Sequence, residues 1–290
     1  MIDLHIHTKY SDGTDKVIEV LNKAENMGLE AISITDHDKV DAYFELENID
    51  VSKYYNGKII KGAELKTIYN SVPIEILGYG IDTMKIKNSK YIIDQSNIQK
   101  KYLNQLKEIG EKTGLKFDDK IKIDDNNIYA SSTFGKEIFK HKENEKIIKE
   151  YDLGNEGNDF YRNAQSNSKS IFYINEMGNV TSAEKIVDEI HNAGGLAFLA
   201  HPLIYPFEDK LKVIEECINQ IDLDGLECWY SLFDNEQVQS LIRLCEKYNL
   251  YKSGGSDYHG LAKPNIDLGV GKGNLNISIE YVKDWIEKVK

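Results

Sequence analysis

The sequence predicts an α/β protein built on a parallel barrel that a mostly helical subdomain interrupts. Three observations predict this fold. Short apolar segments alternate with helical patterns near both ends of the chain, a long middle segment lacks that alternation, and polar side chains suited to metal binding follow several of the apolar segments. Strands that alternate with helices favour a parallel sheet. The carboxyl ends of the strands in a parallel barrel meet at one face, where active sites are built.

The first part of the predicted barrel covers residues 1–82. Ile2, Leu4 and Ile6 alternate with polar residues, which is the period of a half-buried strand. A helix over residues 15–27 follows, and Gly28 is placed to end it. Further strands are expected at 31–35, 59–60 and 72–79, with a helical stretch after Val40.

Residues 83–179 have a different character and are expected to form the inserted subdomain. They are rich in Lys, Asn, Asp and Ile, and they carry amphipathic helical patterns at 97–111 and 133–151 with few strand signals. The barrel pattern returns over 180–290. Thr181-Ser182-Ala183-Glu184 has the form of a capping box, opening a helix that ends at Gly194-Gly195. Strands are expected at 196–200, 226–229 and 250–253, and helices at 208–221 and 235–248.

The composition limits the classes of partner. A net charge of −12 argues against broad binding to duplex nucleic acid, which needs a basic surface. It is compatible with a small phosphorylated substrate, because bound cations make a positive pocket inside an acidic protein. The cysteines Cys217, Cys228 and Cys245 lack CxxC spacing, so we expect neither a disulfide framework nor a thiolate zinc site. No apolar window suits a membrane span, and we expect a cytoplasmic protein.

Metal-ligating side chains follow the predicted strands in a recurrent way. His5 and His7 share one face of a strand about 6–7 Å apart, so both can reach one cation. Imidazoles mixed with carboxylates suit Mn, Fe or Zn. More than four such residues converge, which indicates two or more cations, and a carboxylate such as Glu64 or Asp257 could bridge them. The candidate ligands are His5, His7, Asp12, His37, Glu64, Glu75, His201, Asp257 and His259.

Five motifs resemble those of the PHP (polymerase and histidinol phosphatase) family, in the family's order. They are HIHTKYSDGT, SITDHD, KGAE, LAHP and GGSDYHG. The resemblance covers residues 1–82 and about 170–270, and it is strongest to stand-alone phosphoesterases such as nucleoside 3′,5′-bisphosphate phosphatases and 5′–3′ exoribonucleases. Jointly these motifs are specific, whereas HxH alone is weak.

The resemblance implies a distorted (β/α)7 barrel that holds three divalent metals. It assigns His5, His7, Glu64 and Asp257 to one metal, Glu64 and His201 to a second, and Asp12, His37 and His259 to a third. It also implies that a metal-activated hydroxide attacks phosphorus, with His37 or His259 as the residue that protonates the leaving oxygen.

Two departures from the family pattern bear on these expectations. Glu75 stands where the family usually has a histidine, so it is either a harder ligand or a solvent-facing strand residue. Ser131-Ser132-Thr133 replaces an Arg-Pro-His motif of close relatives, which leaves specificity for bisphosphate nucleotides open. Lys39, Lys66 and Lys263 lie beside the motifs and are candidate contacts to substrate phosphate, or else ordinary solvated lysines.

The leading prediction is a metal-dependent phosphoesterase acting on a small phosphorylated substrate, a nucleotide or a short oligonucleotide. Three alternatives remain open: a histidinol-phosphate phosphatase, an amidohydrolase-type enzyme that cleaves C–N bonds, and a non-catalytic PHP module. The amidohydrolase pattern usually needs a bridging lysine, where this chain offers Glu64. A non-catalytic module is expected to have lost ligands, and Glu75 is the one residue that favours it.

Overall fold

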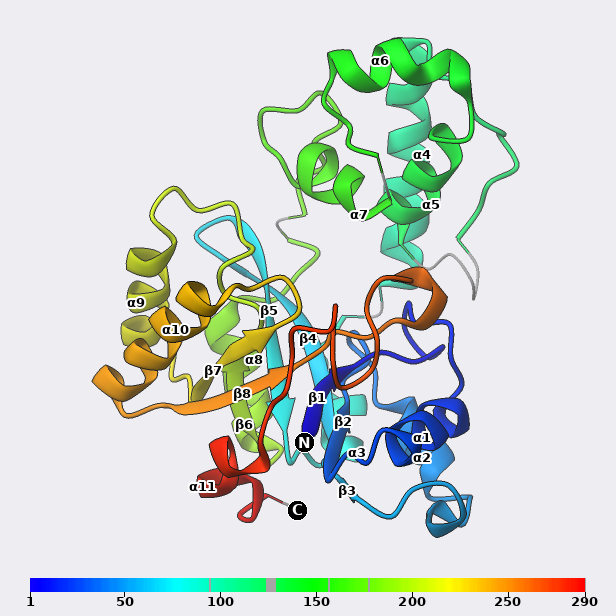
Figure 1. Ribbon diagram of the computed structural model, residues 1–290. Coiled ribbons are helices and arrows are strands. Elements are labelled where there is room, and N and C mark those ends of the chain that lie inside the picture. Colours follow the sequence, from blue (N-terminus) through cyan, green and yellow to red (C-terminus); the bar gives the residue numbers. More distant parts are fainter. Residues whose placement is uncertain (94, 124–128, 156, 177, 290) are drawn as a thin grey trace. The chain divides into compact units, whose positions relative to one another are not determined.

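The structure is a computed structural model that describes residues 1–93, 95–123, 129–155, 157–176 and 178–289. The chain divides into two compact units (Figure 1). The first contains residues 1–93 and 180–290, and the second contains residues 94–179. All the strands of the described chain belong to the first unit.

The first unit contains two sheets. Their strands are β1 (Ile2–Ile6), β2 (Ala31–Ile34), β3 (Lys58–Ile59), β4 (Gly62–Tyr69), β5 (Val72–Tyr79), β6 (Leu196–Leu199), β7 (Gly225–Tyr230) and β8 (Tyr251–Gly255). β1, β2 and β3 form a parallel sheet, and β4 to β8 form a five-stranded sheet in chain order. Within the second sheet, β6, β7 and β8 are parallel, whereas β5 is antiparallel to both β4 and β6.

The antiparallel β5 corrects the expectation of an all-parallel barrel. β4 and β5 are joined only by Asn70 and Ser71, which have φ values of 48° and 65°. A two-residue connection with positive φ makes a hairpin, whereas a parallel pair needs a crossover of a dozen or more residues. The short link between the strands therefore decided their direction.

The two sheets meet at the ends of their strands. The amide of Asp257 donates to the His5 carbonyl at 2.9 Å, and the amide of His7 donates to the Tyr258 carbonyl at 2.8 Å. The amide of Asp38 donates to the Glu64 carbonyl at 2.9 Å. The described strands thus form an α/β fold in two sheets, which isolated parallel bridges join at Ile6 with Tyr258 and at His37 with Glu64.

The helices of the first unit are α1 (Val17–Asn26), α2 (Asp41–Leu46), α3 (Thr83–Lys87), α8 (Ala183–Asn192), α9 (Lys210–Gln220), α10 (Asn235–Tyr248) and α11 (Lys283–Ile286). The predicted capping box at α8 is wrong by one residue. Ser182 is the N-cap and makes no side-chain cap hydrogen bond, while the Thr181 hydroxyl donates to the Tyr91 carbonyl. No helix in the described part of the chain is long and apolar enough to cross a membrane.

The second unit is helical and has its own apolar core around Phe134, Phe160 and Phe172. Its α-helices are α4 (Ser96–Thr113), α5 (Ala130–Ile138), α6 (Glu145–Glu150) and α7 (Gly157–Phe160). The prediction of one helix over 133–151 is wrong, because this segment forms two helices, α5 and α6, with a turn between them. The buried Asn144 side chain donates to the Ile138 carbonyl at 2.8 Å, which satisfies the end of α5 and fixes the break.

Candidate metal centre

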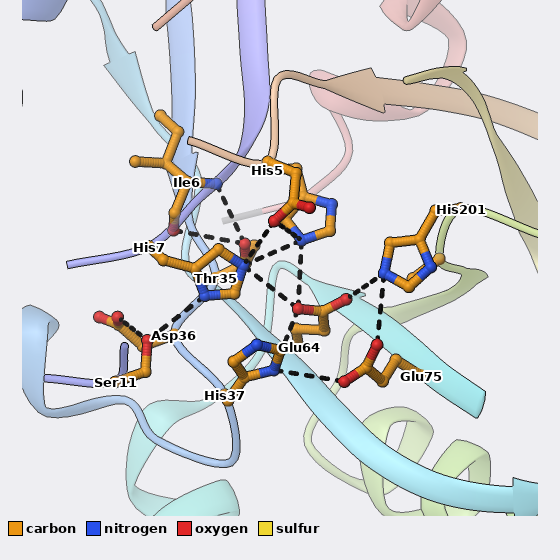
Figure 2. Close-up of polar contacts among 12 residues, drawn as sticks. His5, Ile6, His7, Ser11, Thr35, Asp36, His37, Glu64, Glu75 and His201 are labelled. Atoms are coloured by element: carbon orange, nitrogen blue, oxygen red, sulfur yellow. Dashed lines mark hydrogen bonds and ion pairs between the residues drawn. The ribbon is translucent and has the colours of Figure 1, made fainter. Parts of the chain in front are cut away.

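Imidazoles from the ends of β1 and β2 converge on one oxygen of Glu64, near the start of β4 (Figure 2). Glu64 Oε2 lies 3.2 Å from both His5 Nε2 and His7 Nε2. It lies 3.1 Å from His37 Nδ1. This oxygen is buried and has no hydrogen-bond partner in the described part of the chain. Ligand atoms that share a cation at bond lengths of about 2.0–2.2 Å lie about 3.0–3.5 Å apart, so the spacing suits a metal.

The other oxygen of Glu64 faces a second set of ligand atoms. Glu64 Oε1 lies 2.8 Å from His201 Nε2. Glu75 Oε2 lies 3.3 Å from the same nitrogen, and Glu75 Oε1 lies 3.5 Å from His37 Nδ1. Glu75 therefore turns into the cluster and not away from it, as Figure 2 shows. Glu64 presents one oxygen to each set, which is the arrangement that a carboxylate bridging two cations requires.

A third set surrounds Asp12. Its Oδ1 lies 3.1 Å from His259 Nε2 and 3.7 Å from both His7 Nδ1 and His37 Nε2. Asp12 Oδ1 is buried and makes no hydrogen bond to any described residue. Three groups of ligand atoms are each compact enough for one ion: His7, Asp12, His37 and His259; His5, His7 and Glu64; and His37, Glu64 and Glu75.

Asp257 is held so that one oxygen faces the cluster. Its Oδ1 lies 3.3 Å from His7 Nε2, while Oδ2 accepts from Lys263 Nζ at 2.5 Å and from the Tyr230 hydroxyl at 2.8 Å. Asp257 also has a φ of 57°, a backbone conformation that is uncommon for a residue with a side chain. Of the two carboxylates expected to be able to bridge cations, only Glu64 therefore has both oxygens facing imidazoles.

The electrostatics of the cluster favour cations. Burial lowers the pKa of His7, but Asp257 and Glu64 outweigh it and raise that pKa to about 9. Burial is likewise outweighed at His201, where Glu64 and Glu75 raise the pKa to about 10. Burial raises the pKa of Glu64, yet the neighbouring His5 and His37 hold it well below its ordinary value. The carboxylates therefore stay ionised and buried, and bound cations or protons must balance their charge.

The two acids that flank His37 contact neighbouring segments. Asp36 accepts from the Thr8 and Ser11 hydroxyls, at 2.7 and 2.5 Å, and Ser11 Oγ lies 3.3 Å from His7 Nδ1. Asp38 accepts from the backbone amide of Lys66.

The three lysines proposed as phosphate contacts differ in their surroundings. Lys263 forms an ion pair with Asp257, and Lys39 is exposed. Lys66 lies on β4 next to the hairpin partner Glu75. None of these contacts identifies a phosphate site.

Sequence reasoning missed Glu227, a fully buried acid on β7 that lies 2.9 Å from His5 Nδ1. A signal was present, because a charged residue within the otherwise apolar strand GLECWY needs a buried partner.

Comparison with known proteins identifies the family. Residues 3–193 match the model of the PHP domain. The chain belongs to the PHP domain family. It is 27% identical over 261 residues to a 5′-3′ exoribonuclease of Haemophilus influenzae, covering 89% of each chain. It is 24% identical to a 3′,5′-nucleoside bisphosphate phosphatase of Chromobacterium violaceum, covering 92% of this chain and 90% of the relative.

Among solved structures, a protein from Bifidobacterium adolescentis described as a metal-dependent phosphoesterase shares the fold. It superimposes with a TM-score of 0.69 at 21% identity, over 100% of this chain and 96% of that chain. The PHP-family expectation is thereby confirmed, as is an α/β fold like that of this neighbour.

Proposed function

We propose that this PHP protein is a metal-dependent phosphoesterase that hydrolyses a phosphate ester of a nucleotide or short oligonucleotide. The observation that carries the proposal is Glu64, a buried carboxylate whose two oxygens face separate sets of imidazoles and whose Oε2 makes no hydrogen bond to a described residue. Such an arrangement is costly without cations, because a buried anion must be compensated.

The residues present fit two or three divalent cations of the Mn, Fe or Zn type. His5, His7, Glu64 and Asp257 would hold one, and Asp12, His37 and His259 another. Glu64, Glu75 and His201 would hold a third, with harder donors. When bound, such cations activate water and neutralise charge on the phosphoryl oxygens.

Within this proposal His37 is the candidate for protonating the leaving oxygen. Its side chain is 12% exposed, against 3% for His259, so it is the more accessible of the two catalytic candidates. Both nitrogens of each ring face other groups of the cluster, since His37 Nδ1 lies 3.1 Å from Glu64 Oε2 and its Nε2 lies 3.7 Å from Asp12 Oδ1. His259 Nδ1 likewise lies 2.8 Å from the Asp257 carbonyl and its Nε2 lies 3.1 Å from Asp12 Oδ1, so the greater exposure of its side chain is what favours His37.

The substrate class rests on the relatives and on the charge of the chain. The two curated relatives are named for activity on RNA and on nucleoside bisphosphates, and the chain aligns with about nine-tenths of their length. A net charge of −12 disfavours long nucleic-acid contacts, which depend on released counterions. A small or short substrate that enters the cation pocket satisfies both observations.

The test compares four substrates with purified protein in manganese and in chelator. They are p-nitrophenyl phosphate, adenosine 3′,5′-bisphosphate, a 5′-phosphorylated oligoribonucleotide and histidinol phosphate. We expect manganese-dependent phosphate or nucleotide release that Glu64→Gln abolishes. A Glu143→Gln variant, which changes an acid outside the cluster, should keep the activity. Turnover of histidinol phosphate alone would instead support that alternative, and cation binding without turnover of any ester would point to C–N hydrolysis.

A further inference from the structure

Glu227 connects two segments that carry candidate ligands. Its Oε1 lies 2.9 Å from His5 Nδ1, and its Oε2 accepts from the backbone amide of His201 at 2.7 Å. The residue is fully buried. β7 carries Glu227 and lies next to β6, and His201 is the second residue after the end of β6. One side chain therefore uses each of its oxygens on a different part of the centre.

The first contact determines which ring nitrogen of His5 carries the proton. A carboxylate at 2.9 Å accepts a hydrogen bond from Nδ1, so the neutral ring keeps its proton there. The lone pair of Nε2 is then directed at the cluster, where Glu64 Oε2 lies 3.2 Å away. An imidazole can bind a cation only through a nitrogen that carries no proton.

The second contact holds His201 in an uncommon backbone conformation. Its φ is 28°, in the positive range that residues with side chains rarely adopt. Such conformations persist only where surrounding contacts fix them. The bond from its amide to Glu227 is one such contact, and His201 Nε2 in turn lies 2.8 Å from Glu64 Oε1.

We propose that Glu227 is a positioning residue that sets the tautomer of His5 and the backbone of His201, and so prepares two of the cation positions together. This inference rests on the proposed function, because it takes both histidines as ligands. Carboxylates that hold the far nitrogen of a ligating histidine typically change metal affinity about 10–100-fold when they are replaced.

Glu227→Gln is the informative substitution because an amide offers only one acceptor oxygen. If that oxygen faces His5, the NH₂ group meets the His201 amide, and two donors oppose each other. If the amide flips, its NH₂ group faces Nδ1 and favours the tautomer with the proton on Nε2. Either orientation damages one ligand.

The chain offers a matched control three residues earlier. Asp224 lies 2.8 Å from His191 Nε2 and accepts from the Ala197 amide at 2.7 Å, the same pairing of an imidazole with a backbone amide. His191 belongs to none of the candidate metal groups of the described chain. Both contacts of Asp224 use Oδ2, so Asp224→Asn neutralises an acid paired with an imidazole and a backbone amide without reaching the metal centre.

The experiment measures manganese affinity by competition with a chromogenic chelator, with folding followed by circular dichroism. We expect Glu227→Gln to bind manganese about 10–100-fold more weakly than the wild type, and Asp224→Asn to bind it equally well. Excess manganese should restore kcat in Glu227→Gln with KM unchanged. Equal affinity in the wild type and Glu227→Gln would overturn the inference, whereas a wild type without manganese affinity would overturn the proposed function itself.

If Glu227→Gln does not fold, Glu227→Asp replaces it, since Asp keeps both acceptor oxygens on a shorter side chain. We expect weaker manganese binding than in the wild type, because one of the two contacts must lengthen. Unchanged affinity in that folded variant would also overturn the inference.

Discussion

Cation binding to this centre should release protons, and the structure gives a minimum number. The pKa of His7 is raised to about 9 and that of His201 to about 10, so both rings are protonated at neutral pH before a cation binds. A ligating nitrogen must lose its proton, so filling the positions that use these rings releases at least two protons.

The sign and the size of the pH effect follow from this count. Each displaced proton weakens the apparent affinity about tenfold for every unit by which pH falls below the raised pKa. Two protons over two pH units give about four decades in the overall loading constant between pH 8 and pH 6. Rings with an ordinary histidine pKa of about 6.5 would instead leave the loading constant almost flat above pH 7.

Isothermal titration calorimetry with manganese, in two buffers of different protonation enthalpy, measures the protons released at each pH. Chelator competition at pH 6, 7 and 8 measures the loading constant. A His191→Gln variant changes a histidine outside the candidate metal groups and should leave the proton count unchanged. A loading constant that stays flat from pH 7 to pH 8 would refute the reasoning, because it would mean that the rings are neutral before the cation arrives.

Three further outcomes are expected. Glu75→His replaces a hard donor by an imidazole and should raise the occupancy of zinc relative to manganese by about tenfold in metal analysis. An unchanged ratio would mean that Glu75 is not a ligand. Lys263→Met removes one of the two donors that orient Asp257 Oδ2 and should weaken manganese binding with KM unchanged. A raised KM alone would make Lys263 a phosphate contact. The hydrogen bond to Asp224 raises the pKa of His191, so the ion pair stabilises the fold more at low pH. His191→Gln should therefore lower the free energy of urea unfolding by less than about 1 kcal/mol at pH 6 and by still less at pH 9. An equal loss at both pH values would contradict the ion pair.

Local patterns predicted the positions of most strands but not the direction of one. The strands expected at 31–35, 72–79 and 196–200 correspond to β2, β5 and β6 to within a residue. Their apolar periodicity is a property of a few consecutive residues, and it survives in the fold. Direction depends on the connection, and here the two-residue turn at Asn70-Ser71 reverses the chain.

The ligand motifs could be predicted to gather because they lie at or near strand ends, whereas the partners of Glu227 could not be predicted. Short sequence motifs around His5, His37 and His201 identify these residues as candidate ligands. Glu227 has no such motif, and its partners lie 222 and 26 residues away along the chain. The pairing of β7 with β6 brings it to His201. β7 reaches His5 through β8, beyond which the Asp257 amide donates to the His5 carbonyl.

The reversal of β5 also explains how Glu75 reaches the centre. In a parallel strand that begins at Val72, residue 75 would lie about 13 Å before the carboxyl end where ligands gather. In the antiparallel strand, Ile76 is paired with Leu199, and the Glu75 carbonyl accepts from the Ala200 amide at 3.0 Å. Glu75 is thereby level with His201, at the end of β6. The turn at residues 70 and 71 thus decides whether the set of ligand atoms around His201 has a second carboxylate beside Glu64. Shifting its register by one residue would turn Glu75 to the opposite face of the sheet.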